Sequence, residues 1–176
     1  MRKLRTIEMN RLTLEEFKEA EKLPLIVVLD DVRSLYNVGS VFRSCDAFRV
    51  EAVYLCGITA TPPNAEIHKT ALGAEETVDW EYFEDTMEAV DKLKQQGYTV
   101  CAVEQAEGST MLDNLLLDKN KKYAVIMGNE VKGVQQCVVD NCDMCIEIPQ
   151  YGTKHSLNVS VTTGIIIWDF FKQLSD

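Results

Sequence analysis

One stretch of sequence decides the fold: Leu25-Ile26-Val27-Val28-Leu29-Asp30-Asp31-Val32-Arg33-Ser34-Leu35-Tyr36-Asn37-Val38-Gly39-Ser40-Val41-Phe42-Arg43-Ser44. It opens on an uninterrupted run of apolar residues, and this lack of alternation predicts a strand buried on both faces, as in the middle of a parallel sheet. A polar loop follows, and a helical pattern over about 38–48 comes after the loop. Strand, loop and helix in this order indicate a βαβ unit.

The same order recurs along the rest of the chain. Further apolar runs of strand length cover 52–56, 98–103, 123–127 and 145–148. A weaker run over 77–82 predicts an edge strand. Helical patterns lie between these runs, at 63–72, 85–96, 135–141 and 157–174. We therefore predict an α/β fold with a mostly parallel sheet and helices on both of its faces.

The first 23 residues form a segment of their own. Thr13 and Glu16 have the spacing of a capping box, which predicts a helix that Leu23-Pro24 would end. A chain of 176 residues is long enough for one substantial core and short for two. We therefore predict a helical extension over 1–23 and a single domain over 24–176, in which 104–118 is an irregular stretch long enough to belong to a site.

The charge of the chain is acidic overall and basic at its start. A net charge of −10 argues against wholesale coating of nucleic acid, because phosphate binding is driven by lysine and arginine side chains. The first eleven residues contain one acidic residue, Glu8, and four basic residues, which are Arg2, Lys3, Arg5 and Arg11. An RNA-contacting arm and a short solvated terminus both fit this pattern, and the sequence leaves the two open.

The six cysteines are scattered through apolar surroundings, without a secretory signal or a compact spacing. We therefore expect reduced thiols in a cytoplasmic protein. Cys137, Cys142 and Cys145 are close in sequence, but no further cysteine pair or histidine group completes a tetrahedral zinc site, so we predict no bound metal. The apolar run over 165–171 is far too short to cross a bilayer, and we expect no membrane contact.

Three polar loops follow strand-like runs, at 29–44, 126–134 and 148–160. Ligands of open parallel sheets bind beyond the carboxyl ends of the strands, so these loops should meet in one site. Neither GxGxxG nor GxxxxGK[ST] occurs, and Gly128 with Gly133 is by itself compatible with a tight strand-to-helix turn. A site is favoured because the loops would bring together five polar side chains, namely Asn37, Arg43, Glu130, Asn158 and Ser160.

Taken together, the loops resemble the three motifs of the SpoU (TrmH-like) RNA ribose methyltransferases of the SPOUT superfamily. The first motif runs from Asn37 to Ser44, the second from Gly128-Asn129-Glu130 to Gly133, and the third from Ile148-Pro149 to Ser156-Leu157-Asn158-Val159-Ser160. The motifs stand in the family's order, and the resemblance extends over nearly everything from position 25 onward. Two positions depart from the commonest pattern, with Gln150 in place of a methionine and Asn129 in place of a proline.

The resemblance implies a topology that general rules would not select, since true knots are essentially absent from proteins. The C-terminal segment would be threaded through a loop as a trefoil knot, and S-adenosyl-L-methionine would bind within that knot. The resemblance also implies an RNA substrate and a homodimer with its active site near the subunit interface.

Residue roles follow from the same resemblance. The catalytic group would be Arg43, Asn37, Glu130, Ser160 and Asn158. The cofactor would be bound by Glu104, Gly128, Asn129, Gly133, Ile148, Pro149, Ser156 and Leu157. Basic residues around the site that would contact RNA are Arg33, Lys69, Lys132 and Lys154.

The matching arginine in the family is proposed to act as a base. Because a guanidinium keeps its proton in proteins, we expect Arg43 to grip the phosphate beside the target ribose and to stabilise developing alkoxide charge. His155, with Lys154 as its neighbour, fits a phosphate contact better than a role as general base.

Two other functions fit the sequence. A catalytically idle RNA-binding protein would retain the same fold, and a doubly wound domain for another nucleotide would have an unknotted crevice. For the enzyme we expect tRNA rather than ribosomal RNA as the substrate, because no added RNA-binding domain is visible. The sequence leaves open whether the ribose or the base is methylated.

Overall fold

The computed structural model describes residues 1–175, and in this part of the chain seven parallel strands form one sheet. The order across the sheet is β3-β2-β1-β6-β4-β7-β5. The strands are β1 (Leu23–Asp30), β2 (Val50–Cys56), β3 (Asp79–Phe83), β4 (Tyr98–Val103), β5 (Thr110–Met111), β6 (Lys122–Met127) and β7 (Met144–Glu147). Because β6 lies between β1 and β4, the loops that follow these three strands leave the sheet side by side.

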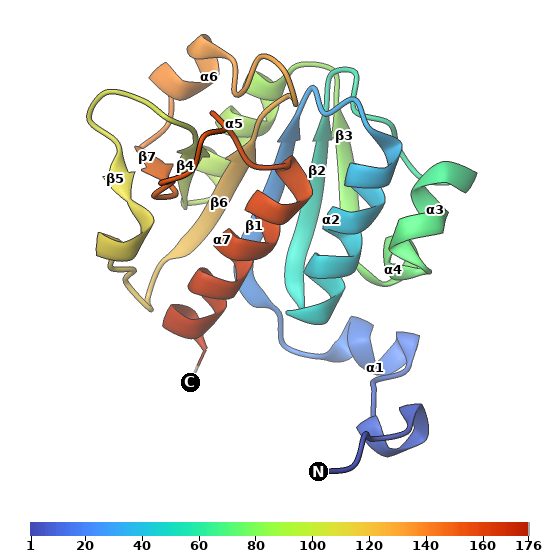
Figure 1. Cartoon of the computed structure of the whole chain (residues 1–176). Coiled ribbons are helices and arrows are strands. Elements are labelled where there is room, and N and C mark those ends of the chain that lie inside the picture. Colours follow the sequence, from blue (N-terminus) through green and yellow to red (C-terminus); the bar gives the residue numbers. More distant parts are fainter. Residues whose placement is uncertain (176) are drawn as a thin grey trace.

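Helices cover both faces of the sheet (Figure 1). The α-helices are α1 (Leu14–Glu19), α2 (Leu35–Ala47), α3 (Ala65–Ala71), α4 (Ala74–Thr77), α5 (Thr86–Gln95), α6 (Gln136–Asp140) and α7 (Val159–Leu174). Two short 3-10 helices, η1 and η2, cover Thr6–Met9 and Leu112–Asn114. The helices α2 and α7 lie on one face, with α3 and α4 beside α2, whereas α5 and α6 lie on the other.

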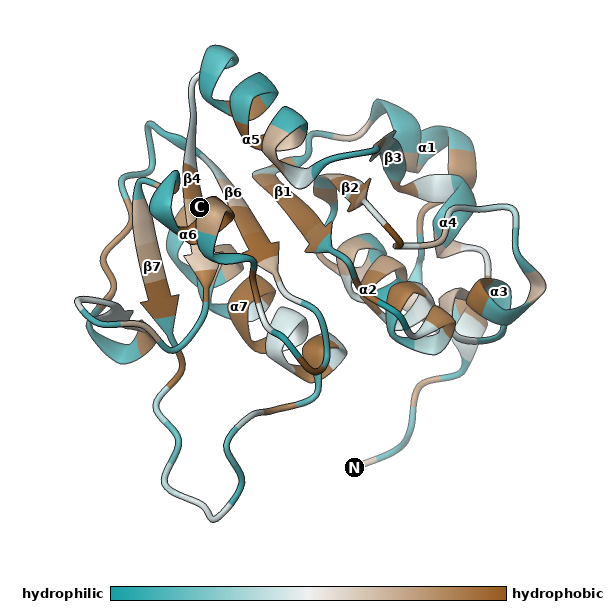
Figure 2. Ribbon diagram, turned by 90° about the horizontal axis from the view of Figure 1, so that it is seen from above, coloured by the Kyte–Doolittle hydropathy of each residue, from teal (hydrophilic) through white to brown (hydrophobic). Residues whose placement is uncertain are grey.

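The apolar run of β1 is buried on both sides of the sheet, as its composition predicts. Leu25, Val27 and Leu29 point into the core beneath α2 and α7, whereas Ile26 and Val28 point into the core beneath α5 and α6. In Figure 2 the strands β1, β4, β6 and β7 are largely brown, whereas the outer helix α5 is largely teal. A central strand of this kind needs no polar face, because both of its faces pack against helices.

The α/β class, the parallel sheet and the helices on both faces are confirmed, and the weak run over 77–82 is the edge strand β3. The second edge strand, β5, was not expected, because it lies inside the stretch taken as an irregular loop. Only two residues long, it has no apolar run of its own, and it is a strand because it pairs with β7.

The N-terminal segment is partly as predicted. Thr13 caps α1, since its hydroxyl accepts a hydrogen bond from the backbone N–H of Glu16 at 3.2 Å and the Glu16 carboxylate accepts one from the N–H of Thr13 at 2.8 Å. The prediction that Leu23-Pro24 ends this helix is wrong, because α1 already ends at Glu19 and both residues belong to β1. Pro24 is tolerated there because the pairing register between β1 and β2 shifts between Leu23 and Ile26.

All six cysteines are free thiols, and Cys45, Cys56 and Cys101 are buried. Burial raises the pKa of Cys56 to about 12. Over residues 1–175, no His, Cys, Asp and Glu side chains gather in threes or more as a metal site would require. None of the helices described is both long enough and apolar enough to span a membrane.

Candidate functional site

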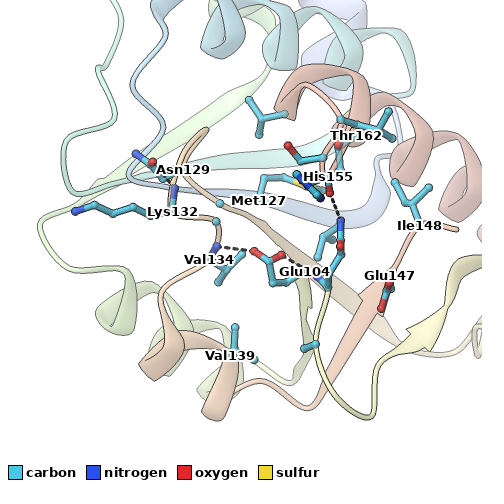
Figure 3. Close-up of a pocket in the computed structure, with 18 of the residues that line it drawn as sticks. Glu104, Met127, Asn129, Lys132, Val134, Val139, Glu147, Ile148, His155 and Thr162 are labelled. Atoms are coloured by element: carbon cyan, nitrogen blue, oxygen red, sulfur yellow. Dashed lines mark hydrogen bonds between the residues drawn. The ribbon is translucent and has the colours of Figure 1, made fainter. Parts of the chain in front are cut away.

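A cavity of about 1100 Å³ lies beyond the carboxyl ends of β4, β6 and β7 (Figure 3). Its walls come from the segment after β4, from the loop over residues 128–135, and from the loop over residues 149–157 with the start of α7. Ligand pockets commonly enclose roughly 300–1000 Å³, so this open cavity can hold a small molecule. The structure thus places two of the three motif loops around one cavity.

Hydrogen bonds connect all three motif loops. The Glu130 carboxylate accepts the backbone N–H groups of Arg33 and Ser34, both at 2.9 Å, and the side-chain amide of Asn37 at 3.1 Å. The Asn37 carbonyl oxygen in turn accepts the side-chain amide of Asn158 at 3.1 Å. Residues more than a hundred positions apart therefore form one chain of polar contacts at the edge of the sheet.

Asn158 occupies the N-cap position of α7. Its side-chain oxygen accepts the N–H and the hydroxyl of Ser160, at 2.9 and 2.6 Å, and the N–H of Val161 at 3.3 Å. Asparagine is among the best N-cap residues because its oxygen satisfies the unpaired N–H groups of the first turn. The cap holds the Asn158 amide in the direction of Asn37, which extends the polar chain to Ser160.

The environment of Glu130 keeps its carboxylate ionised. Partial burial works against the charged form, but hydrogen bonds from the N–H groups of Arg33 and Ser34 outweigh it, so the pKa of Glu130 lies below its ordinary value. Those two N–H groups lie at the start of α2, where the helix dipole also favours a negative charge. Glu130 is thus a fixed anion and hydrogen-bond acceptor at neutral pH.

The 128–135 loop is tightly closed. Asn129 and Gly133 exchange two backbone hydrogen bonds, at 3.1 and 2.9 Å, and Gly133 has a φ of +69°. A Cβ atom at Gly133 would overlap the carboxylate of Glu104, which accepts the N–H of Val134 at 3.0 Å (Figure 3). A Cβ at Gly128 would overlap the backbone of Gly133 and Val134. Both glycines are required because backbone and carboxylate approach so closely here.

The predicted cofactor residues mostly line the cavity. Glu104, Gly128, Asn129, Gly133, Ile148, Ser156 and Leu157 do so, whereas Pro149 does not. Glu104 also supports the wall, because its two carboxylate oxygens accept the N–H groups of Val134 and Gln105. The cavity wall combines the apolar side chains of Ile148 and Leu157, the latter 40 % exposed, with the backbone of Gly128 and Gly133. Such a mixture suits a ligand with a flat ring and polar edges.

Arg43 stands apart from this cavity. It is exposed, it makes no hydrogen bond or ion pair with any described residue, and it lines a separate hollow of about 450 Å³. Ser40, Ser44, Thr70 and Lys69 line the same hollow. Arg43 lies six positions after Asn37, which corresponds to about 9 Å along the axis of α2. Of the five residues expected to converge, four are therefore connected by hydrogen bonds within one copy of the chain, whereas Arg43 lies apart from them.

The four basic residues predicted to contact RNA occupy different surroundings. Arg33 is exposed in the loop after β1, which does not line the cavity. Lys154 is exposed in the 149–157 loop, which does, and Lys132 lines the cavity itself. Lys69 forms an ion pair with Glu66 at 2.7 Å and lines the hollow of Arg43. His155 lines the cavity, where its carbonyl oxygen accepts the side-chain amide of Gln105 at 2.5 Å (Figure 3).

Three residues of the site were not singled out from the sequence. Asp30 is fully buried at the end of β1 and is bonded to Gln135, and Gln105 reaches across to the 149–157 loop. The available signal for Asp30 was a carboxylate directly after a run of buried apolar residues, a place where an unpaired charge would be costly. Gln105 and Gln135 carried no comparable signal.

Fold and site together define a class, an α/β protein whose open parallel sheet carries a ligand cavity at the carboxyl ends of its strands. The model of the SpoU rRNA Methylase family matches residues 24–168. The chain therefore belongs to this family.

Individual relatives agree with this assignment. The chain is 32 % identical over 161 residues to the 23S rRNA (guanosine-2'-O-)-methyltransferase RlmB of Pseudomonas aeruginosa, and the match covers 91 % of this chain and 64 % of that protein. The crystal structure of the A. aeolicus TrmH/SpoU tRNA modifying enzyme is similar, with a TM-score of 0.80, 29 % identity, and coverage of 91 % of this chain and 80 % of that one. The AdoMet-bound rRNA methyltransferase of Sinorhizobium meliloti matches with a TM-score of 0.80, 25 % identity, and coverage of 91 % and 61 %. The chain thus spans less than two thirds of the Pseudomonas and Sinorhizobium proteins.

Proposed function

We propose that this protein is an S-adenosyl-L-methionine-dependent RNA methyltransferase that acts on a ribose 2'-hydroxyl. The observation that carries the proposal is the polar chain from Glu130 through Asn37 and Asn158 to Ser160, at the mouth of the cavity. Family membership and the AdoMet-bound relative support the choice of cofactor. We also propose that the segment after β7 is threaded as the family's trefoil knot, and that the protein acts in the cytoplasm.

The cavity supplies what the cofactor requires. Backbone groups of the 128–135 loop and of Ile148 and Leu157 would bind the polar edges of the adenosine and methionine parts, with the Ile148 and Leu157 side chains against the adenine. When bound, S-adenosyl-L-methionine supplies an electrophilic methyl group. The protein then has to position the ribose and help its hydroxyl to lose a proton.

The polar chain and Arg43 have different roles in the proposed methyl transfer. Glu130 holds Asn37, and Asn37 holds Asn158, so their amides have fixed directions before substrate arrives. Arg43 binds the phosphate next to the target nucleotide and stabilises the negative charge that develops on the ribose oxygen. The hydroxyl groups of Ser40 and Ser44 and the ammonium of Lys69 make its hollow suitable for a phosphate, whereas the Thr70 hydroxyl already donates to the carbonyl of Tyr36 at 2.9 Å.

A second copy of the chain would complete the site. Val161, Ile165 and Trp168 lie on one side of α7 and are 52, 36 and 50 % exposed. The Trp168 ring packs against Phe48 with a centroid distance of 5.8 Å, and Phe48 lines the hollow of Arg43. An apolar helix face of this kind suits a protein partner. We propose a homodimer in which this face of α7 is covered and the partner lies beside Arg43.

The RNA class is left to experiment, because the relatives act on different RNAs according to their names: 23S rRNA in Pseudomonas and tRNA in A. aeolicus. Purified protein would be incubated with labelled S-adenosyl-L-methionine and either tRNA or ribosomal RNA, followed by nucleoside mass spectrometry. We expect a 2'-O-methylated nucleoside in one of the two. A methylated base without ribose methylation would contradict the proposed reaction.

Arg43→Ala tests the assigned chemistry. We expect kcat to fall by roughly 100-fold or more, while calorimetry shows nearly unchanged affinity for S-adenosyl-L-methionine. Arg49→Ala is the matched control, because it removes an exposed arginine just beyond the same helix, and it should keep kcat within about threefold. Full activity of Arg43→Ala would refute its role. No cofactor binding at millimolar concentration would favour an idle RNA-binding protein.

A further inference from the structure

The carboxylate of Asp30 is fully buried, although the reaction gives it no task. Asp30 is the last residue of β1, at the edge of the sheet where the motif loops leave. A buried carboxylate is costly unless its oxygens accept good hydrogen bonds. The partners of Asp30 therefore indicate what it holds in place.

Those partners lie on two elements. One oxygen accepts the hydroxyl of Thr86, the first residue of α5, at 2.6 Å and the side-chain amide of Gln135 at 2.7 Å. The other oxygen accepts the backbone N–H of Gln135 at 2.9 Å. Gln135 is the last residue of the 128–135 loop and the N-cap position of α6. Asp30 thus fastens the end of that loop to the central strand.

A second carboxylate, that of Glu104, binds the residue that precedes Gln135. Glu104, which follows β4, accepts the N–H of Val134, so two consecutive N–H groups of the loop are bound by carboxylates at the carboxyl ends of two different strands. Charge-assisted hydrogen bonds of this kind are about twice as strong as neutral ones. The remaining N–H and C=O groups of the loop are then held at fixed positions in the cavity wall.

We infer that Asp30 is a positioning residue for the cofactor, which acts by holding the 128–135 loop through Gln135. The inference rests on the proposed function in that it takes S-adenosyl-L-methionine as the ligand of this cavity. Asp30 itself does not line the cavity and would not touch the cofactor. Its removal should weaken cofactor binding through the loop and leave methyl transfer by the saturated enzyme almost unchanged.

Four variants of the full chain test this role. Asp30→Ala removes all acceptors, whereas Asp30→Asn can keep them, because the Thr86 hydroxyl and the Gln135 amide can each reverse their direction. Gln135→Ala removes one bond at an exposed position and will fold. Thr86→Val is the matched control, since it removes a bond from α5 to Asp30 and keeps both bonds from Gln135.

Hydrogen exchange of the cofactor-free protein gives the first readout. We expect the Gln135 amide to exchange about tenfold faster or more in Asp30→Ala and close to the wild-type rate in Thr86→Val. Calorimetry with S-adenosyl-L-methionine gives the second. Affinity should fall about tenfold in Asp30→Ala and about threefold in Gln135→Ala, should largely recover in Asp30→Asn, and should stay within about twofold in Thr86→Val, with kcat nearly constant throughout.

Two results would overturn the inference. Unchanged exchange at Gln135 in Asp30→Ala would show that the carboxylate does not hold the loop, and equal losses of affinity in Thr86→Val and Asp30→Ala would show a general effect of stability. A wild-type protein that binds no S-adenosyl-L-methionine would refute the proposed function instead, and the exchange rates would still decide whether Asp30 holds the loop.

Discussion

The two loops that face each other across the cavity are held very differently. The 128–135 loop is bonded to β1 through Asp30, to α2 through Glu130 and to the segment after β4 through Glu104. The 149–157 loop, among the residues described, has a single hydrogen bond, from Gln105 to the carbonyl of His155. In Figure 2 this loop extends far from the rest of the protein, and Tyr151 within it is 95 % exposed.

This difference indicates separate tasks for the two walls. A wall that is fixed before the ligand arrives lowers the cost of ordering on binding, and a loosely held wall lets the ligand enter and leave. We therefore expect the 128–135 loop to supply preformed contacts. We expect the 149–157 loop to become ordered when the cofactor binds, with Ile148 and Leu157 at its two ends as the apolar contacts.

Paired glycine substitutions test the comparison with the largest expected effect. Gly133→Ala places a side chain at a φ of +69° and displaces Glu104 from Val134. We expect cofactor binding to weaken about 30-fold, which corresponds to about 2 kcal/mol of binding free energy. Gly152→Ala, in the other loop, meets no atom within 4 Å and should change affinity less than about twofold. Calorimetry measures both. Similar losses in the two variants would show that the loops are equally constrained.

Acid should release the fixed loop from α2. Because the folded pKa of Glu130 lies below the ordinary value of 4.5, its charge stabilises the protein fully above that value, and the stabilisation is lost as the pH falls through the folded pKa. Glu130→Gln should lower the free energy of unfolding by about 1 kcal/mol at pH 7, a modest cost because the site is screened by solvent.

Urea unfolding at several pH values checks this prediction. The difference between wild type and Glu130→Gln should shrink as the pH falls below about 4.5 and vanish in stronger acid. Glu19→Gln, which neutralises an exposed carboxylate at the end of α1, is the control and should show no such dependence. A difference that stays constant down to strong acid would contradict the assignment to the Glu130 charge.

The smallest expected effect concerns the loosely held loop. Gln105→Ala removes the single hydrogen bond that the loop makes within residues 1–175 and should change the free energy of unfolding by less than about 0.5 kcal/mol. Trypsin cleavage after Lys154 should nevertheless become several times faster, and added S-adenosyl-L-methionine should protect this site in both proteins. Cleavage at the wild-type rate would show that the bond to His155 does not restrain the loop.

Most of the fold was predictable because the apolar runs are long and regular. β1 and β6 lack polar interruptions, and the helices that flank them have clear caps, such as Asn158 for α7. The elements that escaped prediction depend on pairing instead of composition. The strand β5 exists because it pairs with β7, and Pro24 is accepted in β1 because the register shifts beside it.

Most of the site was predictable from the kinds of residue in the three motifs. Glu130 and Asn37 meet because they follow the neighbouring strands β6 and β1, whereas Asn158, which follows β7, reaches Asn37 because α7 packs beside α2. The sequence could not separate Arg43 from them, because its distance depends on the turns of α2 and on what lies beside that helix. It also could not show that Glu104 supports the loop as well as lining the cavity.

The sequence by itself determined the parallel sheet, its central strand and the three polar loops at one edge. Burial on two faces produces an uninterrupted apolar run, and helix capping requires particular residue types, so both can be recognised from consecutive residues. Only the tertiary structure decided how firmly each loop is held. That property depends on partners such as Asp30 and Gln135, which lie 105 positions apart and meet only when β1, α5 and α6 pack together. A hydrogen bond between distant residues has no local signature, since neither partner alone reveals the other.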